Sequence, residues 1–357
     1  MIQKNQTKLL YQQEQFPIFQ NRMYDTETEA KACPKGDVKL VEDLSTGLVY
    51  NAAFRPEQMS YDANYQNEQA LSPLFQEHLD AVSSIIDRCI GRNSIVEVGC
   101  GKGYFLEMLL EKGFDITGFD PTYEGHNAKV MKRYFEPGVG ITANGLVLRH
   151  VLEHIQDPYS FLQQLKAANG GTGKIYIEVP CFDWISEHRA WFDIFYEHVN
   201  YFRISDFYRM FGTVVESGRL FGNQYLYVVA ELASLREPKM DPNDGVIFPD
   251  DFTHNINRPG KAEKTQSIIW GGASKGVIFA LLKARAGQPV STVIDINPAK
   301  QGKYLPGTGL LVQSPSEALA VLPKTSTIYV MNSNYLTEIK KMSGNTFSYI
   351  EIDNVTR

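Results

Sequence analysis

The chain has 357 residues, a length that favours two or three domains over a single core. Its hydrophobic fraction of 43% and charged fraction of 21% are those of an ordinary globular protein, and its net charge of −6 offers no basic surface to nucleic acid. No apolar run is long enough to cross a membrane, and the first residues lack the apolar stretch of a secretory signal, so we expect a cytoplasmic protein.

The four cysteines are widely separated and form no CxxC pair: Cys33, Cys89, Cys100 and Cys181. This spacing argues against a disulfide framework and against a closed zinc site, and it favours free thiols in a reducing compartment.

Residues 1–70 are polar and rich in Gln, Asn, Glu and Tyr, and we expect an irregular arm with a small subdomain. A short strand is expected at Gly47–Tyr50 and a helix near Pro73–Arg88. From residue 94 onward, short apolar strands alternate with helices, which predicts a mostly parallel sheet covered on both faces. The expected elements are strands Ser94–Val98, Asp115–Phe119, Leu146–Leu148, Lys174–Val179 and Tyr225–Glu231, and helices Tyr104–Lys112 and Ser160–Ala168.

A proline-containing, Asp- and Asn-rich stretch at Leu235–Gly260 reads as a linker, with room for a helix inside it. A second alternation follows it, with strands Ser267–Trp270, Ser291–Asp295 and Thr327–Met331 and helices Val277–Arg285 and Leu336–Met342. The sequence therefore predicts an α/β protein divided into residues 1–70, 71–234 and 235–357.

The first glycine loop has GxGxG spacing over Gly99, Gly101 and Gly103 and lies between an expected strand and an expected helix. Such glycines let a ligand approach the backbone closely. Asp120 ends the next strand and could accept hydrogen bonds from ribose hydroxyls, while Glu97 suits a ligand that carries an ammonium and a sulfonium. The alternative is a structural glycine turn beside a surface acid, but the combination favours a ligand site.

These residues resemble the motif of class I methyltransferases, in which the loop cradles the methionine part of S-adenosylmethionine. The string RHVLEHIQDPYSFLQQL resembles the segment after the fourth strand of that superfamily, so the resemblance implies that Arg149 and His150 contact the cofactor. His150, Glu153 and His154 have metal-ligand chemistry, but no further compact cluster accompanies them, and we expect no metal.

A second group of titratable residues, Tyr196, Glu197 and His198, lies in the aromatic-rich stretch Phe192–Phe202. Burial among aromatic rings could bring a His or Glu pKa close to neutrality, as general acid–base catalysis requires. The alternative is an amphipathic segment with a core histidine.

This stretch resembles the active-site segment of the sugar C-methyltransferases, which act on nucleotide-linked keto sugars in antibiotic biosynthesis and have an N-terminal zinc-binding, a central methyltransferase and a C-terminal Rossmann-like domain. The resemblance implies that His198 removes a proton next to a carbonyl and that Glu197 orients His198 or contacts the sugar. Tyr196 is a further nearby proton carrier, because Phe195 replaces the tyrosine usual in that family. In the N-terminal region Cys33 alone remains, so we expect a degenerate zinc-binding subdomain without tightly bound zinc.

The third group is GGASKG at residues 271–276, which follows an expected strand and opens a helix. Backbone amides at a helix start favour an anion, so Gly272, Ser274 and Lys275 are expected to hold the nucleotide or phosphate of the substrate. A tight structural turn is an equal alternative, and an NAD site is disfavoured because the GxGxxG spacing is missing.

Together these features predict an S-adenosylmethionine-dependent methyltransferase that methylates a carbon atom of a nucleotide-linked keto sugar, or of a similar activated carbonyl compound, through an enolate generated by His198. An O- or N-methyltransferase acting on another small molecule is the next alternative. A non-catalytic cofactor-binding subunit that supports a partner enzyme is the third.

Overall fold

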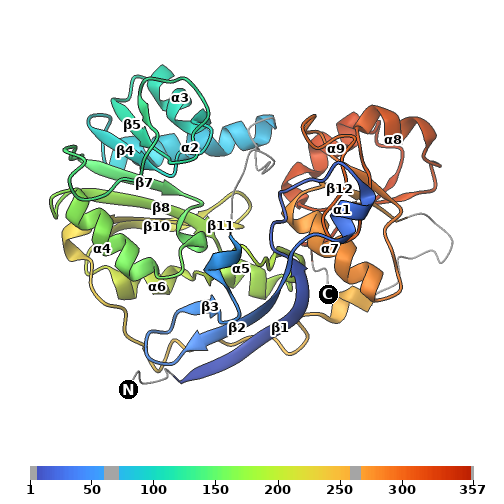
Figure 1. Ribbon diagram of the computed structural model, residues 1–357, viewed down its shortest axis with the longest axis horizontal. Helices are drawn as coiled ribbons and strands as arrows, with labels where there is room; N and C mark the ends of the chain where they lie inside the picture. Colours follow the sequence, from blue (N-terminus) through green and yellow to red (C-terminus); the bar gives the residue numbers. More distant parts are fainter. Residues whose placement is uncertain (1–5, 60–71, 258–266, 355–357) are drawn as a thin grey trace.

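The computed structural model describes residues 6–59, 72–257 and 267–354. The described strands form three sheets, of seven, five and four strands. In Figure 1 the seven-stranded sheet fills the left half, the five-stranded sheet lies in the right half, and the four-stranded sheet lies below and between them. The predicted α/β class is confirmed, whereas the predicted boundary at residues 70–71 lies outside the described residues.

The seven-stranded sheet contains β4 (Ile95–Val98), β5 (Ile116–Phe119), β6 (Val130–Met131), β7 (Gly145–Arg149), β8 (Lys174–Pro180), β10 (Val214–Leu220) and β11 (Tyr225–Glu231). Its strand order is β10-β11-β8-β7-β4-β5-β6. The strands from β8 to β6 pair in parallel, and β11 and β10 are antiparallel to their neighbours. The strand order reverses at β4, which pairs with β5 on one side and β7 on the other, and ligands of open α/β sheets bind at such a point.

Helices pack on both faces of this sheet: α2 (Pro73–Cys89), α3 (Tyr104–Glu111), α4 (Pro158–Ala168), α5 (Phe182–Glu187) and α6 (Ile204–Met210). Helix α2 starts where the Ser72 side chain accepts the Phe75 N–H and Pro73 occupies the first turn. It packs on Val147 of β7, whereas α4 packs on the opposite face through Leu162. Alternate residues of β7 therefore serve two separate cores, as expected for a central parallel strand.

The five-stranded sheet is parallel throughout and has the order β14-β13-β12-β15-β16. Its strands are β12 (Ser267–Trp270), β13 (Thr292–Ile294), β14 (Val312–Gln313), β15 (Thr327–Val330) and β16 (Ser348–Glu351), and its helices are α7 (Ser274–Arg285), α8 (Pro315–Val321) and α9 (Leu336–Met342). The order reverses at β12, and the carboxyl edge at such a point is where ligands of open α/β sheets bind.

The N-terminal region is not the irregular arm expected from the sequence. It forms an antiparallel sheet of β1 (Thr7–Pro17), β2 (Lys35–Asp43) and β3 (Val49–Asn51), with the short helix α1 (Glu27–Lys31) between β1 and β2. β9 (Asn200–Tyr201), from the middle of the chain, completes it. The strands are polar on one face and buried on the other, so tertiary packing overrides their weak strand propensity.

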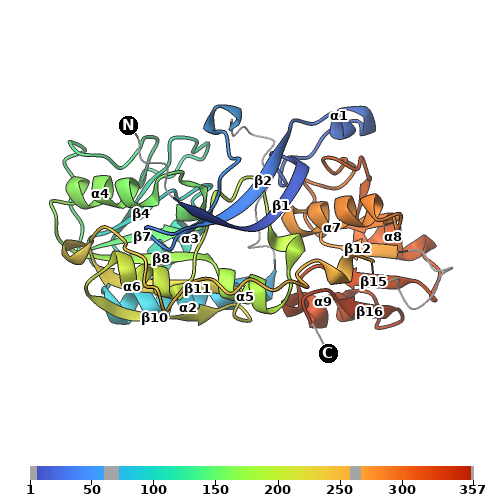
Figure 2. The same ribbon diagram turned by 90° about the horizontal axis from the view of Figure 1, so that it is seen from below.

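Figure 2 shows β1 and β2 running across the junction of the two larger parts, with α1 against the C-terminal part. This placement agrees with the Gly307 N–H donating to the Ala30 carbonyl at 2.8 Å. Short 3-10 helices occur at Pro56–Gln58, Leu152–His154, Trp191–Asp193, Leu232–Ser234, His254–Asn257 and Ser333–Tyr335. Within the described residues, no helix has the length and apolar character needed to span a membrane.

Candidate functional site

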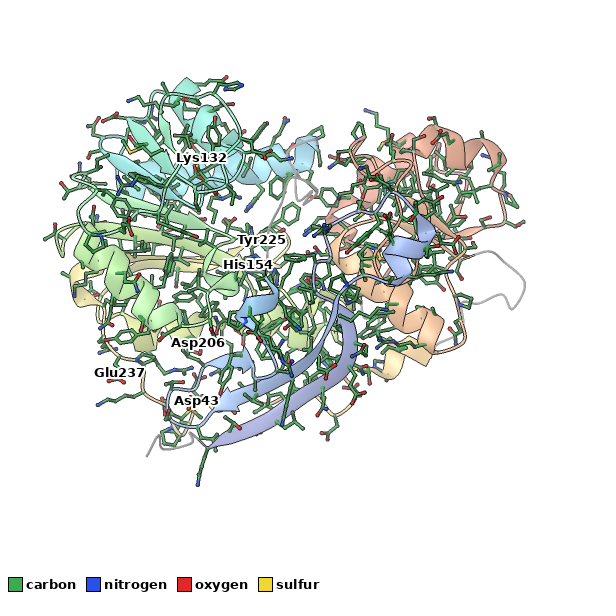
Figure 3. All side chains as sticks on the ribbon, in the orientation of Figure 1. Asp43, Lys132, His154, Asp206, Tyr225 and Glu237 are labelled. Atoms are coloured by element: carbon green, nitrogen blue, oxygen red, sulfur yellow. The ribbon has the colours of Figure 1, made fainter. Side chains whose placement is uncertain are left out.

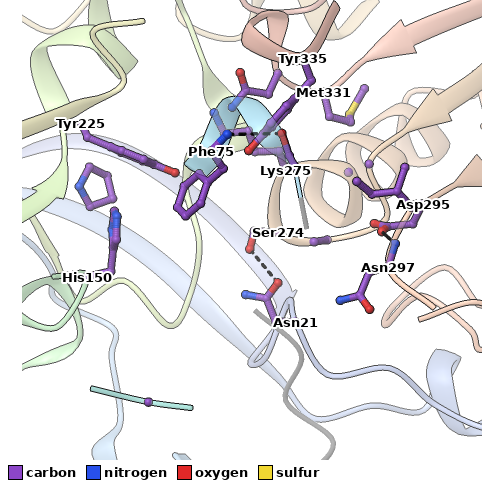
Figure 4. Close-up of a pocket in the computed structure, with 18 of the residues that line it drawn as sticks. Asn21, Phe75, His150, Tyr225, Ser274, Lys275, Asp295, Asn297, Met331 and Tyr335 are labelled. Carbon is purple, nitrogen blue, oxygen red and sulfur yellow. Dashed lines mark hydrogen bonds between the residues drawn. The ribbon is translucent and has the colours of Figure 1, made fainter. Parts of the chain in front are cut away.

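A cleft of about 420 Å³ opens between the carboxyl ends of the parallel strands of the two larger sheets. Gly99 and Gly101 line it from the first glycine loop, and Ser274 and Lys275 line it from the second. Figure 4 shows the two walls, with His150, Phe75 and Tyr225 on one side and Ser274, Asp295 and Asn297 on the other. Members of the two glycine-loop groups that the sequence marked as binding sites therefore line one cavity.

The first loop joins β4 to α3, as predicted, and its three glycines have positive φ angles of 73°, 55° and 82°. A Cβ at Gly99 would lie 2.6 Å from Val151, so this position has no room for a side chain. A Cβ at Gly101 would meet nothing within 4 Å, and this glycine borders open space in the cleft. Gly103 is the N-cap of α3 and is not among the residues that line the cleft.

Two carboxylates beside this loop are in different states. Glu97 lines the cleft, is 3% exposed, and has an Oε2 atom without a hydrogen-bond partner among the described residues. Burial raises the pKa of Glu97 to about 7, against an opposing effect of Arg149. Asp120 instead accepts the Gly101 N–H through Oδ2 at 2.8 Å and the Thr122 N–H through Oδ1 at 2.8 Å. The predicted ribose acceptor is thus bonded to the loop and does not line the cleft.

A buried ionic cluster lies behind the cleft wall and centres on Glu178 of β8. Its Oε1 lies 3.1 Å from the Arg149 guanidinium and 3.2 Å from both His78 Nε2 and His150 Nε2, and its Oε2 accepts the Tyr176 hydroxyl at 2.8 Å. Burial opposes ionisation, but Arg149 and the two histidines hold the pKa of Glu178 well below its usual range. Arg149 and His150 both line the cleft, and their contact with the cofactor stays a prediction.

His198 is the only one of the three predicted catalytic residues among the residues that line the cleft. Its ring lies edge-on to Phe195 at 4.8 Å and to His154 at 4.9 Å between centroids. Burial, followed by the nearby His154 and His150, holds the pKa of His198 well below its usual range. This imidazole is therefore neutral at physiological pH, rather than titrating close to neutrality as the sequence suggested.

Tyr196 and Glu197 contact the N-terminal region instead. The Tyr196 hydroxyl accepts the Arg55 N–H at 3.0 Å and donates to Gln58 at 2.9 Å. Glu197 Oε1 accepts the Gln20 N–H at 3.1 Å. The chain bends at Tyr196 and Glu197, so these two side chains reach the N-terminal region while His198 lines the cleft.

The second glycine loop repeats the hydrogen bonds of the first. The Gly272 N–H donates to Asp295 Oδ2 at 2.8 Å, and the Asn297 N–H donates to Asp295 Oδ1 at 2.8 Å. Asp295 follows β13, the strand beside β12, just as Asp120 follows β5 beside β4. Unlike Asp120, Asp295 lines the cleft, whereas Gly272 does not.

Lys275 is engaged with the central part of the chain. Its Nζ lies 3.0 Å from Asp193 Oδ2 and donates to Gln224 at 2.7 Å, and it lies 5.0 Å from the centre of the Trp184 ring. Its charge is therefore largely offset within the protein, which weakens the predicted phosphate contact. Ser274 donates to Asn21 of the N-terminal region at 3.2 Å.

The structure adds residues to the site that sequence reasoning missed. They line the cleft from distant segments: Asn21, Phe75, Asp193, Tyr225, Asn297, Lys300, Met331 and Tyr335. Figure 3 shows Tyr225 and His154 at the side of the central part that faces the C-terminal part. Asp193 lies in the aromatic-rich stretch already singled out, but the other positions carry no local signal because the fold alone brings them together.

One cluster has the composition of a metal site. Ligand atoms of Glu153, His154 and His198 lie within 4.8 Å of one another and could hold a divalent ion such as zinc or iron. The sequence analysis missed this set because His198 lies far along the chain from the other two residues. A metal bound here would occupy the lone pair that makes His198 a base.

Comparison with known proteins identifies residues 64–214 as a match to a family described as "Methyltransferase domain". The C-methyltransferase NovU of Streptomyces niveus is 21% identical over 301 residues, which cover 71% of this chain and 71% of that protein.

Two solved structures illustrate the structural matches. The plantazolicin methyltransferase BpumL is 15% identical over 46% of this chain and 86% of its own, with a TM-score of 0.36. A SAM-dependent methyltransferase from Archaeoglobus fulgidus is 18% identical over 44% of this chain and 98% of its own, with a TM-score of 0.33. Because both TM-scores are low, the two structures carry no argument. The assignment of this protein as a methyltransferase depends on the family match and on the sheet topology.

Proposed function

We propose that this protein, an S-adenosylmethionine-dependent methyltransferase, methylates a carbon atom next to the carbonyl group of a nucleotide-linked keto sugar. The observation that carries the proposal is the shared cleft: two glycine loops with the same Asp–glycine hydrogen bond open onto it, and His198 lines it. The similarity to a C-methyltransferase supports carbon as the acceptor.

The first loop fits the cofactor. A buried Glu97 oxygen without a partner among the described residues suits an ammonium group, and Gly101 leaves the loop backbone open to a ligand. When bound, S-adenosylmethionine supplies an electrophilic methyl group. The residues that would hold it are those beside the first loop that line the cleft: Glu97, Gly99, Gly101 and Arg149.

The second loop suits the nucleotide. Asp295 borders the cleft after the second strand of its unit, where an acid commonly accepts ribose hydroxyls. Helix α7 begins at Ser274, which lines the cleft together with Lys275, and such a helix start favours a phosphate. Because Asp193 offsets the Lys275 charge, we assign phosphate binding chiefly to the amides of this helix start and to Ser274.

His198 supplies the base. Its neutral imidazole can accept the proton from the carbon next to the carbonyl, and the electron pair of that C–H bond moves toward the carbonyl oxygen to form an enolate. Phe195 and His154 pack against the ring and fix its position. The enolate carbon is then the nucleophile, and alignment within the cleft supplies much of the rate.

Methylation of an oxygen or nitrogen atom is the second candidate. Two observations favour it: the low pKa of His198 makes it a weak base, and Phe195 stands where the resembling family has a tyrosine. A hydroxyl or amine acceptor needs no enolate.

The test uses carbon-13 methyl-labelled S-adenosylmethionine with a panel of nucleotide-linked keto sugars, read by NMR of the product. We expect the label on a carbon-bound methyl group. His198→Asn should lower turnover roughly a hundredfold or more and leave binding of S-adenosylhomocysteine intact.

His188→Asn is the matched control, because His188 also lies beside an aromatic ring but not among the residues lining the cleft. Normal turnover by His198→Asn, or a label on oxygen or nitrogen, would favour the second candidate. Elemental analysis of the same protein showing one metal per chain would make His198 a ligand and exclude it as the base.

A further inference from the structure

Asp193 is a buried carboxylate that lines the cleft and is 6% exposed. It is the last residue of the 3-10 helix Trp191–Asp193, and its N–H donates to the Ala190 carbonyl at 2.8 Å. The Trp191 ring stacks on Phe279 of α7 at 5.5 Å between centroids. This short helix of the central part is therefore held against the C-terminal part, and the position of Asp193 is fixed by both.

The two carboxylate oxygens of Asp193 have different surroundings. Oδ2 lies 3.0 Å from Lys275 Nζ. Oδ1 makes no hydrogen bond with any described residue and is not one of the fully buried atoms that lack a partner, so it is accessible from the cleft. A carboxylate oxygen can accept two hydrogen bonds, and a desolvated one without a donor costs free energy. A ligand that brings a hydrogen-bond donor to Oδ1 would remove this cost.

The ammonium group of Lys275 is itself held by side chains from separate segments. Its Nζ donates to Gln224 Oε1 at 2.7 Å and lies 5.0 Å from the centre of the Trp184 ring. Gln224 Oε1 also accepts Asn332 Nδ2 at 2.9 Å, and Gln224 Nε2 donates to Asn332 Oδ1 at 3.0 Å. Because this network fixes Nζ, it also fixes which oxygen of Asp193 is left for a ligand.

The charges around Asp193 favour a neutral donor. Lys275 already offsets the charge of Asp193, so the pair needs no second cation. A second carboxylate, Asp353, acts on Asp193 through space, but its Oδ2 accepts the N–H and the hydroxyl of Ser333 at 3.0 Å and Gln224 Nε2 at 3.1 Å. A hydroxyl group therefore suits Oδ1 better than an ammonium group does.

Asp193 belongs to the segment that presents the proposed base. Asp193, Phe195 and His198 all line the cleft, whereas Tyr196 and Glu197 do not. The Phe195 ring packs edge-on against His198 at 4.8 Å between centroids. From one short stretch of chain the cleft thus receives an acceptor, an apolar surface and a base. This combination suits a sugar ring, which has hydroxyl donors around a less polar centre.

We propose that Asp193 is a specificity-determining residue: its Oδ1 accepts a hydrogen bond from a ring hydroxyl of the acceptor sugar, so that keto sugars with this hydroxyl are selected over the corresponding deoxy sugars. The inference rests on the proposed function. Asp193 takes no proton and forms no covalent bond. It holds the ring while His198 removes the carbon-bound proton, and Lys275 keeps Oδ1 available by binding Oδ2.

The test compares sugars that differ by one hydroxyl group. The probes are the nucleotide-linked keto sugar that the wild type methylates and analogues that each lack one ring hydroxyl, with affinities measured by calorimetry in the presence of S-adenosylhomocysteine. For one analogue, wild-type affinity should fall about tenfold to a hundredfold, because a hydrogen bond to a charged group commonly contributes that much. Asp193→Asn should bind the parent sugar and this analogue within a few-fold of each other, because its amide oxygen stays with Lys275 and its NH₂ group replaces the acceptor.

Asp183→Asn is the matched control. Asp183 also pairs with a cation, Arg219 at 3.3 Å, but it does not line the cleft. This variant should keep the wild-type preference for the hydroxyl. A purely structural role of Asp193 would weaken binding of both sugars equally and leave their ratio unchanged, whereas the proposal predicts that the ratio collapses. If Asp193→Asn does not fold, Lys275→Met/Asp193→Asn gives the same comparison without an unpaired buried charge.

Three outcomes would overturn the inference while leaving the proposed function intact. Equal wild-type affinity for the parent sugar and every deoxy analogue would show that no ring hydroxyl is recognised. A wild-type preference retained in Asp193→Asn would assign the recognition to another residue. Tighter wild-type binding of an analogue with an amino group in place of the hydroxyl would make the site one for a cation. Absence of methylation of every nucleotide-linked keto sugar by the wild type would instead refute the proposed function, and the inference with it.

Discussion

Glu97 and Asp120 flank the same loop, yet only Asp120 is satisfied within the protein. Asp120 has two backbone N–H donors, whereas Glu97 Oε2 has no partner among the described residues and its pKa is raised to about 7 by burial. A carboxyl held in this state costs free energy when it ionises without a partner. A cationic ligand removes that cost, so cofactor binding and ionisation of Glu97 should be linked.

Affinity for S-adenosylhomocysteine should therefore rise with pH. Ionised Glu97 is the minor form at pH 6 and the major form at pH 8, so we expect up to about a tenfold gain over this range and proton release on binding. Calorimetry in buffers of different ionisation enthalpy measures both quantities. Glu97→Gln should bind weakly and without this pH dependence, and Glu111→Gln, an exposed control on α3, should behave as wild type. A pH-independent wild type would contradict the linkage.

The two glycine loops have the same local structure but different surroundings. Each follows a central strand, starts a helix and has one amide bonded to the acid after the next strand. The first loop lies open at Gly101, while in the second the helix approaches so closely that a Cβ at Gly276 would lie 1.9 Å from the Gly271 carbonyl oxygen. The first loop can therefore accept a ligand against its backbone, and the second presents its helix start instead.

Gly101 gives a direct test of this difference. Gly101→Leu should lower S-adenosylhomocysteine affinity at least tenfold, because the side chain would project from the loop into the cleft. Gly113→Leu is the matched control, since Gly113 also has a positive φ and open space but lies beyond the end of α3, away from the cleft. Both variants should lose a similar stability of about 1–2 kcal/mol in thermal unfolding. Equal loss of binding in the two variants would show that strain, rather than the cleft, is responsible.

Elements with a strong local pattern were predictable from the sequence. The strand–loop–helix units around Gly99 and Gly272 were predicted at nearly their observed bounds, because apolar runs, glycines and helix starts are local signals. The strands β1 and β2 were missed because their Gln- and Lys-rich residues become strand only through packing. The directions of the Tyr196 and Glu197 side chains could not be predicted either, because both residues lie in a bend of the chain and not in a strand or helix whose periodicity would fix them.

The two larger parts of the molecule are joined by charged and polar contacts across the cleft. Lys275 pairs with Asp193, and both side chains are largely buried, at 18% and 9% exposure. The Glu338 carboxylate of α9 accepts the Ser72 hydroxyl and the Leu74 N–H at the start of α2, both at 3.0 Å. These contacts fix the position of the two cleft walls relative to each other, and methyl transfer requires such alignment of the reacting groups.

Breaking the buried pair should be costly. Lys275→Met leaves the Asp193 carboxylate buried without its partner, and we expect a loss of about 3–5 kcal/mol in urea unfolding, with much of it restored in Lys275→Met/Asp193→Asn. Lys303→Met is the matched control, because Lys303 pairs with Asp25 at an exposed position between the N-terminal and C-terminal parts. That change should cost at most about 1 kcal/mol. Similar losses for the two lysine variants would contradict the burial argument.

The N-terminal sheet is completed by β9, and this has a consequence for synthesis on the ribosome. Val49 pairs with Tyr201, so the sheet cannot close until about 150 further residues have left the exit tunnel. Until then β3 presents an unpaired edge, which is a site for pairing with other chains. The first strands must therefore wait for β9, and a fragment ending just before residue 200 should be prone to aggregate although it contains the whole strand–loop–helix unit around Gly99.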